Sequence, residues 1–139
     1  MKDLHNNIEV VSILNPIGIA ATATYTDIDL AGWNSAELVI HIGLDAALDA
    51  SNKWVFTLKD SPDGTTYTAI ETADMLGVTV VAGVILTIDS TDEDNTVYHF
   101  GYVGGQRYLE LICTETGTLT GPMAISLVKS HAQDSPTIV

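Results

Sequence analysis

The stretch from Val97 to Thr114 constrains the fold most, because apolar residues alternate on both sides of a glycine pair. If Gly104 and Gly105 form the two-residue turn of a β-hairpin, where positive φ is needed, every opposing pair is fixed. One apolar face then pairs Phe100 with Leu109, Tyr98 with Leu111 and Tyr102 with Arg107. The other face pairs Val97 with Ile112, His99 with Glu110 and Gly101 with Tyr108. We predict this hairpin to be the central unit of a sandwich or small barrel.

Similar alternation recurs in short segments that are separated by turn signals. It predicts strands over residues 8–14, 20–30 (broken near Thr26), 35–43, 53–59, 65–71, 78–88 and 122–129. The clearest segment places Trp54, Phe56 and Leu58 inward, and the turn at 61–64 makes 65–71 its hairpin partner. Pro16 is expected to end the first strand. About eight or nine short strands predict an all-β fold, an antiparallel β-sandwich or jelly-roll-like barrel.

The length of 139 residues is that of one domain. We predict a single β domain over residues 1–139, with an N-terminal arm (1–7) and a C-terminal tail (131–139). The start of the chain lacks an apolar run of signal-peptide length, and no segment approaches membrane-spanning length. The expected site of synthesis is therefore the cytoplasm, without a membrane partner.

The charge is strongly unbalanced, with 18 acidic against five basic residues and a formal net charge of −13. Such a surface repels a phosphate backbone, so direct nucleic-acid binding is not expected. The single cysteine, Cys113, cannot form an internal disulfide. It shares the inward phase of Leu109 and Leu111, where a thiol serves as a small apolar filler.

No pattern in the chain predicts catalysis or a cofactor. The acidic loop over residues 89–95 lacks the turn glycine and downstream glutamate of an EF-hand, and the four histidines have no ligand-like spacing. No nucleophile elbow or phosphate-binding glycine loop is visible. The sequence therefore predicts no enzyme and no metal site. Near the glycine pair, Tyr102 beside Arg107 is interpreted as a cation–π contact.

Three apolar residues fall in the outward phase of their strands, namely Val39, Val55 and Ile112. A sheet with one face in solvent normally carries polar residues there. These positions therefore indicate that a covering arm or another subunit packs on the sheet.

Three segments together resemble a group of small tailed-bacteriophage virion proteins. They are the opening MKDLHNNIEVVSILNP, the segment DSPDGTTYTAIE followed by ADMLG, and GYVGGQRYLELICT. The resemblance covers nearly the whole chain and implies a head decoration, or cement, protein. It also implies a jelly-roll or related sandwich, trimeric assembly, and the major capsid protein as partner. The expected location is the capsid exterior, after a period in the host cytoplasm during assembly.

Two other classes remain open at this point, a tail-tube or neck component and a glycan-binding or receptor-binding β-module. The second would need either a cation site or an exposed aromatic platform, for which the candidates are Trp33, Trp54, Tyr25, Tyr67 and Tyr108. The predicted subunit or capsid contacts lie in the arm, the outward phases and the tail. They are Leu4, His5, Ile8, Val39, Val55, Ile112, Ile138 and Val139.

Overall fold

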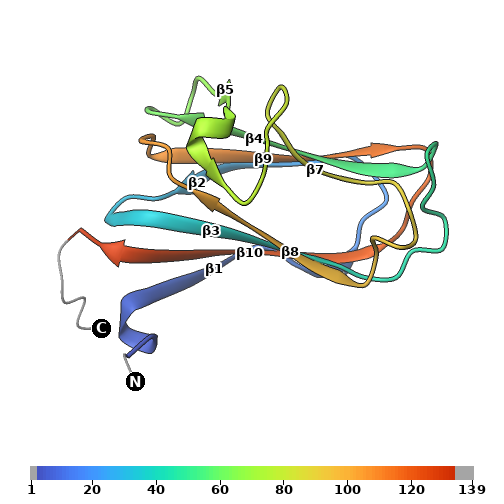
Figure 1. Cartoon of the computed structure of the whole chain (residues 1–139), viewed down its shortest axis with the longest axis horizontal. Coiled ribbons are helices and arrows are strands. Elements are labelled where there is room, and N and C mark those ends of the chain that lie inside the picture. The colour runs from blue at the N-terminus through green and yellow to red at the C-terminus, as the bar shows by residue number, and fades with distance from the viewer. Residues whose placement is uncertain (1–2, 134–139) are drawn as a thin grey trace.

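The computed structural model describes residues 3–133, which form ten β-strands and two short 3₁₀ helices (Figure 1). The helices are η1 (His5–Asn7) and η2 (Thr72–Asp74). The strands are β1 (Ile8–Gly18), β2 (Ala23–Asp29), β3 (Trp33–Ile42), β4 (Lys53–Ser61), β5 (Thr68–Ala69), β6 (Met75–Leu76), β7 (Val84–Ile88), β8 (Thr96–Tyr102), β9 (Tyr108–Thr116) and β10 (Pro122–Ala132).

Two antiparallel sheets pack face to face, as Figure 1 shows. Sheet 1 has the strand order β1-β10-β3-β8-β6, and sheet 2 has the order β2-β9-β4-β5, with β7 also paired to β4. The predicted all-β antiparallel sandwich is therefore confirmed. Among the described residues, no helix is long and apolar enough to span a membrane.

The core lies between the sheets and follows the predicted two-residue alternation. Leu38 and Ile40 of β3 face Phe56 and Leu58 of β4 across the layer, and all four are almost completely buried. Cys113 is also fully buried, which confirms its role as an apolar filler. Burial raises the pKa of its thiol to about 12, because the thiolate would lose its hydration.

The predicted hairpin over residues 97–114 is wrong, although its inward residues are right. β8 belongs to sheet 1 and pairs with β3, whereas β9 belongs to sheet 2 and pairs with β2 and β4. Neither Gly104 nor Gly105 is among the positive-φ residues, so the loop between the strands is not the tight turn that the glycine pair predicts. It carries the chain from one sheet to the other, and it still leaves Phe100, Leu109 and Leu111 buried.

The individual pairs predicted for that hairpin change accordingly. His99 pairs with Glu37 at 2.6 Å, and Glu110 pairs with Lys59 at 3.1 Å. The guanidinium of Arg107 lies over the ring of Tyr108, 4.8 Å from its centroid, rather than over Tyr102. The changed partners of His99 and Glu110 follow from the placement of β8 and β9 in different sheets.

Pro16 does not end the first strand. β1 continues to Gly18 because it is an edge strand, where the missing N–H of proline costs no ladder hydrogen bond. Its pairing with β10 shifts register between Ser12 and Leu14 and again between Leu14 and Ile17. The hairpin between 53–59 and 65–71 is present but short, with only Lys59 opposite Ala69 and Asp60 opposite Thr68.

Candidate assembly surface

The side of sheet 1 that faces away from the core is built almost entirely from uncharged side chains. These positions alternate with core residues along each strand. We call this set the outer face of sheet 1: Ile8, Val10 and Ser12 on β1; Ala124, Ser126, Val128 and Ser130 on β10; Ser35, Glu37, Val39 and His41 on β3; Val97, His99 and Gly101 on β8; and Leu76 on β6. Most of these residues are serine, alanine, glycine or valine, so most of the side chains are small.

Large apolar side chains on this face are open to solvent. Val10 is 60% exposed, Val97 is 52% exposed and Leu76 is 59% exposed. In the registers one row across the sheet runs from Val10 through Val128, Glu37 and Gly101 to Leu76, whereas Val97 lies in another row, beside His41. Several large apolar side chains exposed on one face make it a candidate interaction surface.

The charge distribution separates this face from the rest of the molecule. The chain has 18 acidic residues, yet Glu37 is the only one among the positions of this face, and no lysine or arginine belongs to them. Glu37 is paired with His99. Two chains or a chain and an acidic partner could therefore approach here with little like-charge repulsion.

One end of the face is hollowed into an apolar cavity of about 480 Å³. It opens where β1 leaves its regular register with β10, beside Leu14 and Pro16. Its walls also include His41, Pro122, Met123 and Ala124. A partner that covers the outer face of sheet 1 could place a side chain in this cavity.

The outer face of sheet 2 has a different chemistry. Lys53, Thr57 and Lys59 on β4 alternate with the core residues Trp54, Phe56 and Leu58. β9 adds Glu110, Ile112 and Thr114 in the same phase. Charged groups and threonine hydroxyls interrupt the apolar positions, so this face is suited to solvent.

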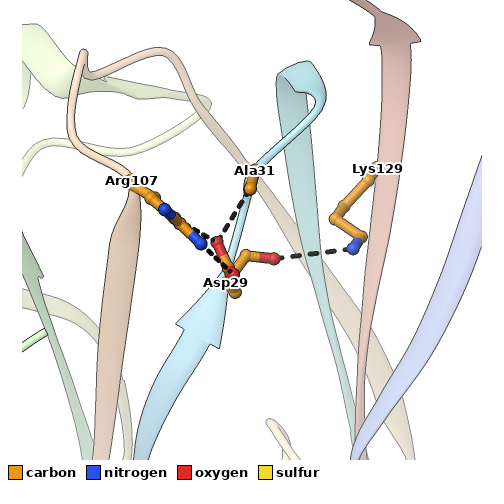
Figure 2. Close-up of polar contacts among 4 residues, drawn as sticks. All are labelled: Asp29, Ala31, Arg107 and Lys129. Atoms are coloured by element: carbon orange, nitrogen blue, oxygen red, sulfur yellow. Dashed lines mark hydrogen bonds and ion pairs between the residues drawn. The ribbon is translucent and has the colours of Figure 1, made fainter.

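A polar cluster ties the two sheets together at the end where β2 finishes (Figure 2). Arg107 donates from Nε and Nη2 to both carboxylate oxygens of Asp29, at 2.9 and 2.8 Å. The backbone N–H of Ala31 donates to the same carboxylate, and Lys129 Nζ of sheet 1 lies 3.5 Å from the Asp29 carbonyl. The hydrogen bond from Arg107 is the main cause that lowers the pKa of Asp29 to about 2. The cluster therefore connects β2 and the start of β9 in sheet 2 to β10 in sheet 1.

The predicted contact residues fall in different places. Ile8 and Val39 belong to the outer face of sheet 1, and Leu4 and His5 lie at its border, where Leu4 is 67% exposed. Val55 and Ile112 lie on the opposite side of the molecule, on the outer face of sheet 2. The structure therefore does not unite Val39 with Val55 and Ile112. Ile138 and Val139 lie outside the described residues.

Sequence reasoning missed most of this face. The small residues of β10, from Ala124 to Ser130, alternate with the buried Ile125 and Leu127. Their polarity is ordinary for a solvated strand, and only the neighbours Val10 and Val97 make them part of an apolar surface. The detectable signal was the absence of charge in the outward phase of these strands.

The other predicted sites can now be placed. The five aromatic residues do not form one platform: Trp54 is buried in the core, Trp33 begins β3 of sheet 1, and Tyr67 lies in the loop before β5. Tyr67 donates to Asp27. The acidic loop over residues 89–95 folds on itself, for example through the hydrogen bond from Asp89 N–H to Glu93. Within residues 3–133 no three histidine, cysteine, aspartate or glutamate side chains come together as a metal-binding group.

No protein-family model matches the chain. No curated protein matches it either. Among solved structures the chain is similar to YomS, a protein derived from the SPBc2 prophage, with a TM-score of 0.54 and 8% identity over 90% of this chain and 94% of that one. It is also similar to a pilus protein of Bacillus endospore appendages (TM-score 0.48, 12% identity, 96% and 98% covered). A third likeness is to the VP2 subviral particle of infectious bursal disease virus (TM-score 0.40, 16% identity, 94% and 33% covered).

At such low identity the first of these matches establishes a shared fold. The resemblance to phage proteins in the sequence is thereby confirmed at the level of the fold, since YomS is prophage-derived. The other two likenesses are too distant to support an argument.

Proposed function

We propose that this chain is a structural virion protein that binds the exterior of a phage capsid as a decoration protein and stabilises the head. The observation that carries the proposal is the outer face of sheet 1, a partly apolar surface on which Glu37 is the only acidic residue, on a chain with a net charge of −13. The fold shared with a prophage-derived protein supports it.

The size of the face supports oligomeric docking. The face is five strands wide, with a spacing of about 4.8 Å, and it extends along β3 from Ser35 to His41. These two dimensions give a footprint of roughly 500 Å². Both partners together would bury about 1,000 Å², which is the lower limit for a stable specific interface. A trimer with three such faces would gain avidity from simultaneous contacts, so we propose a homotrimer on the major capsid protein.

The acidic remainder of the surface has a role in this proposal. It keeps free subunits soluble and apart in the host cytoplasm, because like charges repel away from the neutral face. Docking on the shell is then specific to the one surface on which repulsion is small. The final location is the capsid exterior.

The test compares two valine substitutions in co-sedimentation with undecorated expanded heads. Val97→Asp places a charge on the outer face of sheet 1, whereas Val81→Asp makes the same change at a valine that is 71% exposed outside that face. We expect Val97→Asp to abolish binding and the delay of head rupture on heating, and Val81→Asp to retain both. Equal binding of the two variants, at equal melting temperatures, would remove this face from the proposal.

The termini are tested separately. β10 extends to Ala132, which pairs with Trp33, so the predicted tail over 131–139 begins with strand residues. The C-terminal deletion variant should therefore lack only residues 134–139. A second deletion variant should lack residues 1–7. We expect each to weaken head binding without lowering the melting temperature.

If the purified protein does not bind heads at all, a tail-tube or neck component becomes the better proposal. Negative-stain images that show rings or stacked tubes of the protein alone would support it.

A further inference from the structure

A second hollow, of about 460 Å³, lies at the end of the sandwich next to the cluster in Figure 2. Its walls come from the turn between β2 and β3, the loop between β8 and β9, and the residue that follows β10. The side chains that matter are Trp33, Asn34, Gln106, Arg107 and Gln133. The volume lies in the usual range for small-ligand sites.

The walls are held by backbone hydrogen bonds. Gln106 N–H donates to the hydroxyl of Tyr102 at 3.2 Å, and Gln133 N–H donates to the carbonyl of Gly32 at 2.8 Å. Leu30 N–H donates to the carbonyl of Arg107 at 2.9 Å. The three segments are thus tied to one another before any ligand arrives, which lowers the entropic cost of binding.

The side-chain amides on these walls are exposed to solvent. Asn34, Gln106 and Gln133 make no side-chain hydrogen bond to any residue in the part of the chain that the structure describes. Each amide offers both donors and an acceptor. Neighbouring hydroxyl groups of a sugar also offer a donor and an acceptor each, so amides suit them.

The hollow selects against anionic ligands. Arg107 is the only charged residue on the walls, and its Nε and Nη2 are already bound to Asp29. The net charge of −13 repels anions from the whole surface. Anionic ligands are therefore disfavoured at this site.

Trp33 supplies the apolar part of the site. It is half-buried on the wall, beside the polar amides. An indole combines a large apolar surface with one N–H donor, and it suits a ligand that has an apolar side and polar edges. A neutral sugar ring has that combination, with C–H groups on its faces and hydroxyls at its rim.

We propose that this hollow is a binding site for neutral oligosaccharides, with Trp33 packing on a sugar ring and the amides of Asn34, Gln106 and Gln133 holding its hydroxyls. The site is distinct from the outer face of sheet 1 and does not depend on the proposed function. A decoration protein that carries it would bind glycans of a cell surface or matrix while it is attached to a head.

The two tryptophans make a direct assay possible. In a ¹H–¹⁵N correlation spectrum each indole N–H gives one signal, and Trp54 is buried in the core with its Nε1 unpaired. Titration with cellotriose and chitotriose should shift the Trp33 signal saturably with at least one of them and leave the Trp54 signal in place. Trigalacturonate, an anionic trisaccharide, should shift neither.

Two variants test whether the sugar binds in this hollow or elsewhere on the surface. Gln106→Ala removes a free amide and should weaken binding about two- to ten-fold, the loss expected for one neutral hydrogen bond. Thr91→Ala, in the acidic loop, should bind like the original chain. An unmoved Trp54 signal shows that each variant is folded.

Three results would overturn the assignment. The first is the absence of any Trp33 shift with both neutral sugars. The second is an equal shift with trigalacturonate, and the third is binding of triglycine in preference to the sugars. None of these results bears on head binding, so the two proposals fail or stand independently.

Discussion

Gly104 and Gly105 are neighbours in the loop between β8 and β9, and replacing each with alanine should give opposite results. A Cβ atom on Gly104 would lie 2.5 Å from Cζ and 2.6 Å from Cε2 of Tyr102. Tyr102 is only 3% exposed, and its hydroxyl donates to Asp60 at 2.7 Å. A Cβ atom on Gly105 would have nothing within 4 Å.

The expected magnitudes follow from these contacts. At Gly104 the overpacking costs about 1–3 kcal/mol, and disturbing the Tyr102 hydrogen bonds adds about 1 kcal/mol, so Gly104→Ala should lose about 2–4 kcal/mol. Gly105 is not a positive-φ residue, so Gly105→Ala should gain up to about 1 kcal/mol by restricting the unfolded chain. At this chain length 1 kcal/mol shifts the melting temperature by about 4 °C, which separates the two variants by more than about 8 °C.

The assay is urea unfolding followed by tryptophan fluorescence, with far-UV circular dichroism as a second probe. A type I′ hairpin turn, which is the two-residue turn that a glycine pair favours, would require positive φ at both glycines, so both alanine variants would then be destabilised. Similar losses of stability in the two variants would refute the conclusion that this loop carries the chain from one sheet to the other. A Gly104→Ala protein as stable as the original would refute the close contact with Tyr102.

Three further predictions test the core, the inter-sheet cluster and the cysteine. Phe100→Ala should lower the free energy of unfolding in urea by about 3–5 kcal/mol, because its ring is buried. His99→Ala should lower it by less than about 1 kcal/mol, because the pair of His99 with Glu37 is exposed. Equal losses would contradict the inward phase of β8. Asp29→Asn should lower the melting temperature at pH 5. The pKa of Asp29 falls from 3.8 to about 2 on folding, so its contribution is present above pH 4 and is lost as the pH falls through 2. The difference from the original chain should therefore shrink over that range, and a constant difference would argue against the ion pair. Cys113 should not react with Ellman's reagent at pH 8 in the native state and should react fully in guanidinium chloride, since burial raises the pKa of its thiol to about 12; rapid native reaction would contradict that burial.

The inward phase of each strand was predictable because alternation is a local property. Trp54, Phe56 and Leu58 are apolar at every second position, and any partner strand would leave that set facing a core. The strand break near Thr26 was also predictable, and β2 changes register there, with Asp27 at positive φ. These features depend on neighbours in the chain.

Strand partners were not predictable, because they depend on contacts between distant residues. The residues of β8 and β9 fit a hairpin as well as they fit two separate sheets, since Phe100 and Leu109 face the core in both. The five residues from Val103 to Arg107 are long enough to cross the roughly 10 Å between packed sheets, and a glycine pair permits that path as readily as a turn.

The candidate surface shows the same division. The sequence by itself determined that Val39 points away from the core, that the chain is strongly acidic, and that few outward positions of β10 are charged. Only the tertiary structure decided that β1, β10, β3 and β8 lie side by side, so that their uncharged residues form one face while Val55 and Ile112 belong to the other. A face of a sheet is the sum of several strands, and strand order is set by long-range packing that no local pattern encodes.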